Sequence, residues 1–221
     1  MIRRVAPWVL LVWMSWVIWA AFMRVAPAAG FQGQSSRILF FHVPTAWVAS
    51  LAFLVSCVAS IMYLARRKPV DDARAAASAA LGLLFAVLAT VTGSIFAKVE
   101  WGAFWNWDPR QTSITLLLLI YAAYFALRGA VPDPERRATL SAAYAILAFV
   151  TVPFLIWVVP RIYWSLHPDV MTNPDPDSRL DSSHAQVLMA SLAGFTGLFV
   201  WLYNLETRIE RLRRSRAEEE L

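Results

Sequence analysis

Two histidines, His42 and His167, are the side chains of this 221-residue chain that are best suited to bind a transition metal. Neutral imidazole is the commonest metal ligand in proteins. Pro44 lies two residues after His42 and suits the start of a helix, while Pro168 directly follows His167 and keeps it out of helical geometry. Both imidazoles are therefore expected at the ends of helices.

The third histidine, His184, has a different local setting. It lies in the sequence SSHAQ, where Ser183 is the expected N-cap and Gln186 stands at the position of a capping box. His184 would then occupy the first helical position, near the positive end of the helix dipole. This makes it the weaker candidate ligand.

Tryptophans crowd into the segment KVEWGAFWNWDPRQT, which begins at Lys98. Trp101, Trp105 and Trp107 fall within seven residues, whereas interfacial tryptophans ordinarily flank helices singly or in pairs. Three indoles in one loop predict a flat apolar platform for a flat apolar ligand at the membrane surface. Trp8, Trp47, Trp157 and Trp201 are instead interpreted as membrane anchors.

Asp108 closes the tryptophan segment, and two roles are open to it. The run Asp108, Pro109, Arg110 and Gln111 is typical of N-cap, N1, N2 and N3, with glutamine at the capping-box position. We favour this capping role, which would fix the angle at which the loop meets the next helix. Direct contact with a ligand is the alternative.

One ligand joins these features. Two neutral imidazoles that converge over a flat apolar molecule are what six-coordinate haem iron requires. The expected ligand is haem b, bound as cargo, and the arginines that could neutralise its propionates are Arg37, Arg110 and Arg161. The single cysteine, Cys57, excludes an internal disulfide and a Cys-x-x-Cys-His haem-attachment site.

The elements that must position these residues are membrane helices. Hydrophobic residues make up 59% of the chain and charged residues 16%, against about a quarter in soluble domains, which excludes an ordinary soluble globule. The apolar runs are near the ~20 residues that a helix needs to cross the bilayer, and they lack the alternation of barrel strands. We therefore predict an all-α, polytopic membrane protein, a six-helix transmembrane bundle forming one domain over residues 1–221, with spans at about 5–23, 44–64, 75–97, 109–127, 138–159 and 185–203.

Basic residues cluster beside the ends of these spans. Membrane topology explains the clusters better than a nucleic-acid partner does, despite the net charge of +5. With a cytoplasmic N-terminus, 14 of the 20 Lys and Arg residues fall on the inner side, so both termini are predicted to be cytoplasmic and all three histidines to lie outside. A cleaved signal peptide is an alternative for the first span and leaves this topology unchanged. Residues 204–221 form a predicted cytoplasmic amphipathic helix, either solvated or partner-binding.

The sequence also resembles a known family. WGAFWNWD matches the Trp-Gly-x-x-Trp-x-Trp-Asp motif of the tryptophan-rich (WWD) membrane haem-handling proteins. Within that group the chain is similar, over nearly its whole length, to the cytochrome c maturation protein C family. The similarity includes six spans and the segments FHVPTAW, VTGSIFAKVEWG and WSLHP.

This resemblance implies a bacterial-type inner-membrane protein that is not an enzyme. It would present haem at the outer face and pass it to a periplasmic haem chaperone for c-type cytochrome maturation. The family's axial ligands would fall on His42 and His167, and its haem-binding loop on Trp101, Gly102, Trp105, Trp107 and Asp108. The implied partners further include an ATP-binding-cassette transporter pair and a small single-span membrane protein.

Two other classes of protein stay open at this point. A cytochrome c haem-attachment synthase shares the tryptophan motif but is generally larger, so six spans argue against it. A haem-translocating permease would need a polar route through the bilayer. Arg110 is the only ionisable residue within the predicted spans, and it lies in the first turn of its helix, which also argues against an ion pump.

Overall fold

The computed structural model describes residues 2–28, 30–167 and 180–219, and these form a bundle of helices without a strand among them. Six helices are long and apolar enough to cross a membrane, which confirms the predicted all-α six-span fold. The spanning helices are α1 (Ile2–Trp19), α2 (Leu39–Arg66), α3 (Pro69–Trp101), α4 (Pro109–Ala130), α5 (Pro134–Pro153) and α7 (Ser182–Glu219). Short elements are the π-helical turns η1 (Ala20–Arg24) and η3 (Phe154–Val158), the 3-10 turn η2 (Ser35–Ile38) and α6 (Val159–Ile162).

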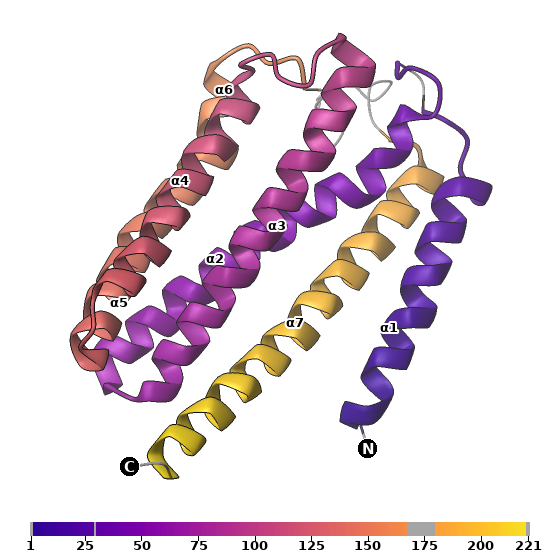
Figure 1. Ribbon diagram of the computed structural model, residues 1–221. Coiled ribbons are helices and arrows are strands. Elements are labelled where there is room, and N and C mark those ends of the chain that lie inside the picture. Colours follow the sequence, from indigo (N-terminus) through magenta and orange to yellow (C-terminus); the bar gives the residue numbers. More distant parts are fainter. Residues whose placement is uncertain (1, 29, 168–179, 220–221) are drawn as a thin grey trace.

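The helices are arranged around α2 and α3, which pack along each other (Figure 1). Helices α4 and α5 lie on one side of this pair, and α7 with α1 lies on the other. Both chain ends lie at one end of the bundle, whereas the tryptophan segment and α6 lie at the opposite end. The candidate site residues are therefore gathered at the end remote from the termini.

The core of the bundle lies between α2, α3 and α4. The rings of Phe53 and Tyr121 stack with centroids 3.6 Å apart, and both side chains are fully buried. Gly82 makes room for this stack, because a Cβ there would lie 2.5 Å from the Phe53 ring. Nearer the termini, Arg128 holds Asp72 through two hydrogen bonds of 2.7 and 3.1 Å, which connects α4 to α3. A bidentate pair of this kind satisfies the buried carboxylate and the partly buried guanidinium at once.

The prediction that α2 begins at Pro44 is wrong, because the helix begins at Leu39 and contains Pro44. A proline inside a helix leaves the carbonyl four residues earlier without its usual donor. That carbonyl belongs to Phe40, and the hydroxyl of Ser191 on α7 donates to it. The neighbouring helix thus replaces the lost hydrogen bond, and His42 comes to lie within the first turns of α2.

The predicted N-cap of the last helix is also wrong. Asp181, not Ser183, caps α7, since its Oδ1 accepts from the backbone N–H groups of Ser183 and His184. His184 therefore lies in the first turn at N3. Its ring is buried against Phe40 and lies 2.9 Å from the Asp181 carboxylate. At its other end α7 continues without a break to Glu219, so residues 204–219 extend the last span.

Candidate functional site

A cavity of about 850 Å³ lies between α2, α7 and the segment from η3 to His167. This volume is within the roughly 300–1,000 Å³ of typical ligand pockets. His42, Arg110, Arg161 and His167 line it together with apolar side chains. A smaller cavity of about 140 Å³ shares His42, Arg110 and His167 and adds Trp105 to the lining. The fold thus brings both candidate axial histidines to the same space.

The ring of His42 is held against α3 by two neighbours. Its Nδ1 lies 3.0 Å from the hydroxyl oxygen of Thr92. That hydroxyl donates its own proton to the carbonyl of Leu88 at 2.8 Å, so its oxygen accepts from Nδ1 of the imidazole. Gly93 supplies the space for the ring, because a Cβ there would lie 2.9 Å from Cε1 of His42. We therefore assign the proton of neutral His42 to Nδ1, which leaves the lone pair on Nε2.

His167 is held in the same way by a carboxylate. Its Nδ1 lies 3.0 Å from Oδ1 of Asp108, so the neutral imidazole donates to the carboxylate and keeps its lone pair on Nε2. The ring of Trp101 packs edge-on against this imidazole with centroids 4.8 Å apart. Histidine ligands of metals almost always donate their second ring N–H to such a partner, which fixes the tautomer and the ring orientation.

Asp108 caps α4, as the sequence favours, and also contacts His167; it is not among the residues that line the two cavities. Its Oδ1 accepts from the backbone N–H of Arg110 at 2.9 Å, which confirms the predicted cap of α4. Its Oδ2 accepts from the backbone N–H of Leu166 at 2.7 Å and from the hydroxyl of Ser165 at 2.9 Å. One buried carboxylate therefore joins the start of α4 to the segment that carries His167.

The electrostatics of this pair keep both groups in the forms that ligation needs. Burial alone would raise the pKa of Asp108, but the hydrogen bonds from Arg110 and Leu166 and the nearby His167 lower it below its ordinary value. Burial lowers the pKa of His167 below its ordinary value, although Asp108 opposes the shift. At neutral pH the carboxylate is thus ionised and the imidazole is neutral.

The three tryptophans do not form the single flat platform that the sequence predicted. Trp101 is the last residue of α3, and Gly102 follows it with a φ of +80°. Trp105 lines the smaller cavity. The rings of Trp105 and Trp107 are edge-on to each other, with an angle of 88° between their planes, and Trp107 is 76% exposed. One indole therefore packs on His167, one lines the cavity and one faces outward.

The first turn of α4 fixes the loop between these tryptophans. The side chain of Gln111 accepts from the backbone N–H of Asn106 at 2.8 Å and donates to the carbonyl of Phe104 at 3.4 Å. Glutamine therefore reaches back along the loop rather than to the N-cap itself. Trp107 adopts a φ of +55°, which is unusual for a residue with a Cβ.

The three candidate arginines are divided by the fold. Arg110 and Arg161 line the larger cavity, and the guanidinium of Arg161 lies 5.4 Å from the centre of the Trp157 ring. Arg37 lies elsewhere, because its guanidinium donates to the carbonyl of Ala21 and to the side chain of Gln34. Two of the three are thus close enough to meet an anionic group of a ligand in the cavity.

Several residues of the candidate site could not be recognised from the sequence. Trp47 and Trp157, interpreted as membrane anchors, line the larger cavity. Thr92 and Gly93 lie on α3 opposite His42, and only the helix packing reveals them. His184 does not line either cavity, in keeping with its lower rank as a ligand. Pro168, which was expected to keep His167 out of a helix, lies outside the described residues.

Thr92→Val provides a test of the His42 hydrogen bond. Valine has nearly the same shape but cannot accept from Nδ1, so the imidazole loses its fixed tautomer and orientation. Losses of such partners typically weaken metal binding about 10- to 100-fold. We expect haem to bind at least about tenfold more weakly, measured by absorption titration of the purified protein. Thr151→Val is the matched control, because the Thr151 hydroxyl donates to the carbonyl of Ala148 in its own helix and Thr151 lines neither cavity. Equal losses in both variants would contradict the assignment.

Known proteins resemble this chain over most of its length. The family model described as heme exporter protein C matches residues 1–221. Heme exporter protein C of Bradyrhizobium diazoefficiens is 36% identical over 86% of this chain and 72% of its own length. The proteins of that name from Rhodobacter capsulatus and Paracoccus denitrificans are 33% and 34% identical, covering 98% and 83% of this chain and 91% and 76% of their own lengths. This chain therefore belongs to the heme exporter protein C family.

Proposed function

We propose that this membrane protein binds haem at the outer face of the inner membrane and delivers it to a periplasmic haem chaperone. The names of its relatives support a haem-handling role in cytochrome c biogenesis. The 14 to 6 distribution of basic residues supports an outer location for the site and cytoplasmic termini. By family resemblance, an ATP-binding-cassette transporter pair and a small single-span protein would assemble with it.

One observation carries this proposal: two imidazoles line one cavity, and each has its Nδ1 within hydrogen-bonding distance of an oxygen atom. In that tautomer both Nε2 lone pairs are available to a metal. Iron in haem b accepts two axial ligands, whereas structural zinc needs four protein ligands. Among the described residues no cluster of three or more His, Cys, Asp or Glu side chains could hold a bare metal ion. The donor set thus suits haem iron.

The remaining walls of the cavity suit the other parts of haem. Phe96, Trp47, Trp157 and Ile156 offer the apolar surface that a porphyrin ring requires. Arg110 and Arg161 would pair with the propionates, as guanidinium groups commonly do with carboxylates. The tryptophan motif contributes Trp105 from the loop and supports His167 through Trp101.

Delivery requires that another protein can approach the bound haem. Three exposed aromatic side chains lie close to the site in sequence: Trp107 at 76% exposure, Tyr163 at 62% and Trp164 at 80%. Exposed aromatic residues are enriched in protein interfaces. We propose that the chaperone contacts this region when it takes haem, with the chain acting as a holding and transfer protein rather than as an enzyme.

The decisive experiment loads the purified protein with haem and mixes it with either the chaperone or an apocytochrome. Transfer to the chaperone alone is expected. Direct attachment to the apocytochrome without the chaperone would instead identify a haem-attachment synthase. Passage of haem across sealed vesicles containing only this protein would identify a permease. A protein that never acquires the absorption bands of bis-histidine haem would refute the proposed binding.

The tryptophans should separate binding from delivery. Trp101→Ala removes the half-buried indole that packs on His167, so haem binding should weaken by about tenfold, near the lower bound for the apolar contact of one large side chain. Trp107→Ala removes an exposed indole, so binding should change little while chaperone loading slows. Titration followed by timed transfer measures both. Weak binding in Trp107→Ala with normal binding in Trp101→Ala would reverse these assignments.

A further inference from the structure

A third cavity lies at the opposite end of the bundle from the histidines, between α1 and α7. The two helices touch closely where α7 has glycines: a Cβ at Gly194 would lie 2.6 Å from Sδ of Met14, and one at Gly197 would lie 2.9 Å from Cδ2 of Leu10. From this contact the helices diverge toward the two chain ends (Figure 1). The divergence leaves a wedge-shaped groove of about 1,000 Å³ that is open to the surroundings.

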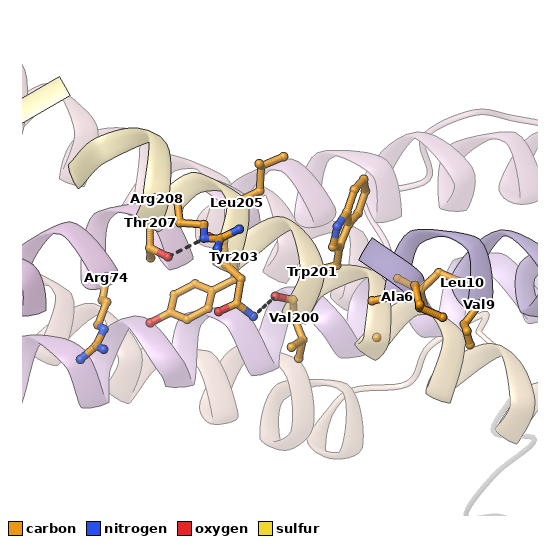
Figure 2. A pocket seen from close by; sticks show the side chains of 13 residues that line it. Ala6, Val9, Leu10, Arg74, Val200, Trp201, Tyr203, Leu205, Thr207 and Arg208 are labelled. Atoms are coloured by element: carbon orange, nitrogen blue, oxygen red, sulfur yellow. Dashed lines mark hydrogen bonds between the residues drawn. The ribbon is translucent and has the colours of Figure 1, made fainter. Parts of the chain in front are cut away.

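The lining of this groove changes from apolar to polar along its length (Figure 2). Near the apex it is formed by Leu10, Gly197, Val200 and Trp201. Toward the chain ends it is mainly polar and is formed by Tyr203, Asn204, Leu205, Thr207 and Arg208, with Arg74 contributed by α3. A groove of this kind matches an amphiphile whose chain lies toward the membrane centre and whose head lies at the membrane surface.

The polar end of the groove carries two guanidinium groups, those of Arg74 and Arg208. Arg74 donates to the buried carboxylate of Asp71 at 3.2 Å, which uses only one of the five N–H groups of its guanidinium. Arg208 is exposed at the same end of the groove. Arginine pairs with phosphate oxygens through parallel hydrogen bonds, and basic pockets between membrane helices are known lipid-headgroup sites.

We propose that this groove binds one anionic phospholipid of the leaflet on the side of the chain ends. Its phosphate lies between Arg74 and Arg208, and one acyl chain fills the apolar part between α1 and α7. The lipid then supports α1, whose packing within the bundle is mainly along α7. Most large side chains of α1 are otherwise exposed, including Trp8, Val12 and Trp19.

A phospholipid fits this groove better than a helix of another protein does. A partner helix would have to bring a carboxylate to the two arginines and leave the tapering apex unfilled. A phospholipid provides an anionic head and a flexible chain in a single molecule, and the chain can taper with the groove. The inference is independent of haem binding, because the groove shares no lining residue with the histidine cavities.

The test is a lipid titration of the delipidated full-length protein, followed by native mass spectrometry. The probes are phosphatidylglycerol and phosphatidylcholine with identical chains, and inorganic phosphate. The first phosphatidylglycerol should bind more tightly than phosphatidylcholine, and phosphate should neither bind nor compete. Arg208→Gln should weaken phosphatidylglycerol binding about fivefold, which corresponds to about 1 kcal/mol per basic residue near an anionic lipid. Arg66→Gln is the control, because Arg66 is exposed at the end of α2 and does not line the groove.

A second pair of variants tests the apolar part without changing charge. Ala6→Trp fills the groove and should weaken phosphatidylglycerol binding, whereas Val12→Trp places the same ring on α1 outside the groove and should not. Equal affinity for the two lipids, or equal losses in Arg208→Gln and Arg66→Gln, would overturn the proposal.

A photocrosslinking residue at Val9 in native membranes should form lipid adducts. A polypeptide adduct in their place would identify a protein as the occupant.

Discussion

Replacing His167 with alanine is expected to convert six-coordinate haem into a five-coordinate form held by His42 alone. The sharp reduced bands of a bis-histidine complex should be lost and the spectrum should become that of high-spin iron. The physical reason is that Asp108 holds Nδ1 of His167, which lines the cavity, and leaves Nε2 as the atom that would bind iron. Alanine has no such atom. His42→Ala should produce the same change from the other side of the ring.

Free imidazole makes this test sharper. It should enter the space left in either variant and restore the six-coordinate spectrum, which distinguishes a lost ligand from a misfolded protein. His184→Ala is the matched control, because His184 is buried against Phe40 and lines neither cavity. Loss of the bis-histidine spectrum in His184→Ala, with normal spectra in the other two variants, would contradict the assignment.

The number and class of the helices could be predicted from the sequence because hydrocarbon imposes a length and a composition on every span. The residues at which the helices begin and end could be predicted less accurately. Helix α2 begins at Leu39 rather than at Pro44. Pro44 leaves the carbonyl of Phe40 without its usual donor, and the hydroxyl of Ser191 on α7 donates to that carbonyl instead. Such compensation comes from a residue 151 positions away in the chain and leaves no local signal.

Several residues that line the larger cavity could be predicted, because residue type alone limits their chemistry. Histidine and arginine stand out in an apolar chain, and His42, His167, Arg110 and Arg161 do line one cavity. The groups that hold the imidazoles did not stand out. A threonine within a helix ordinarily bonds its own backbone, and only the packing of α3 on α2 brings Thr92 to the ring of His42.

The shape of the tryptophan loop was the least predictable feature. Spacing along the chain says nothing about the angle between two indoles, and the positive φ of Trp107 turns its ring outward. Arg37 illustrates the same limit, because it is near the site in the expected topology and yet bonds to the carbonyl of Ala21. Composition identifies candidates, but backbone geometry decides which of them face the ligand.

Asp108→Ala is expected to damage the site more than the loss of a helix cap would. The cap alone contributes about 1 kcal/mol. The same carboxylate also accepts from Leu166 and Ser165 and orients His167, so its removal frees the segment that carries this proposed axial ligand. Losing a partner of this kind typically weakens metal binding about 10- to 100-fold. We expect a haem affinity reduced within that range and a mixture of five- and six-coordinate spectra.

Asp108→Asn should be the milder change, although it is not neutral. The amide oxygen can still accept from the N–H of Arg110 and from Nδ1 of His167, but its NH₂ group cannot accept from the N–H of Leu166 as Oδ2 does. Asparagine also removes the negative charge that raises the pKa of His167. That pKa should therefore fall further, and the imidazole should stay neutral to a lower pH than in the parent protein.

The pH profile separates the two roles of Asp108. Haem uptake by the parent protein should fail as acid protonates His167, at a pH below the ordinary histidine value of about 6.5. In Asp108→Asn uptake should be weaker at neutral pH yet fail at a lower pH. Helix content measured by circular dichroism should stay unchanged. If Asp108→Asn matched the parent protein in affinity and in pH profile, the carboxylate would act as a helix cap alone. If it were as damaging as Asp108→Ala while α4 stayed intact, the negative charge itself would act directly in haem or partner binding.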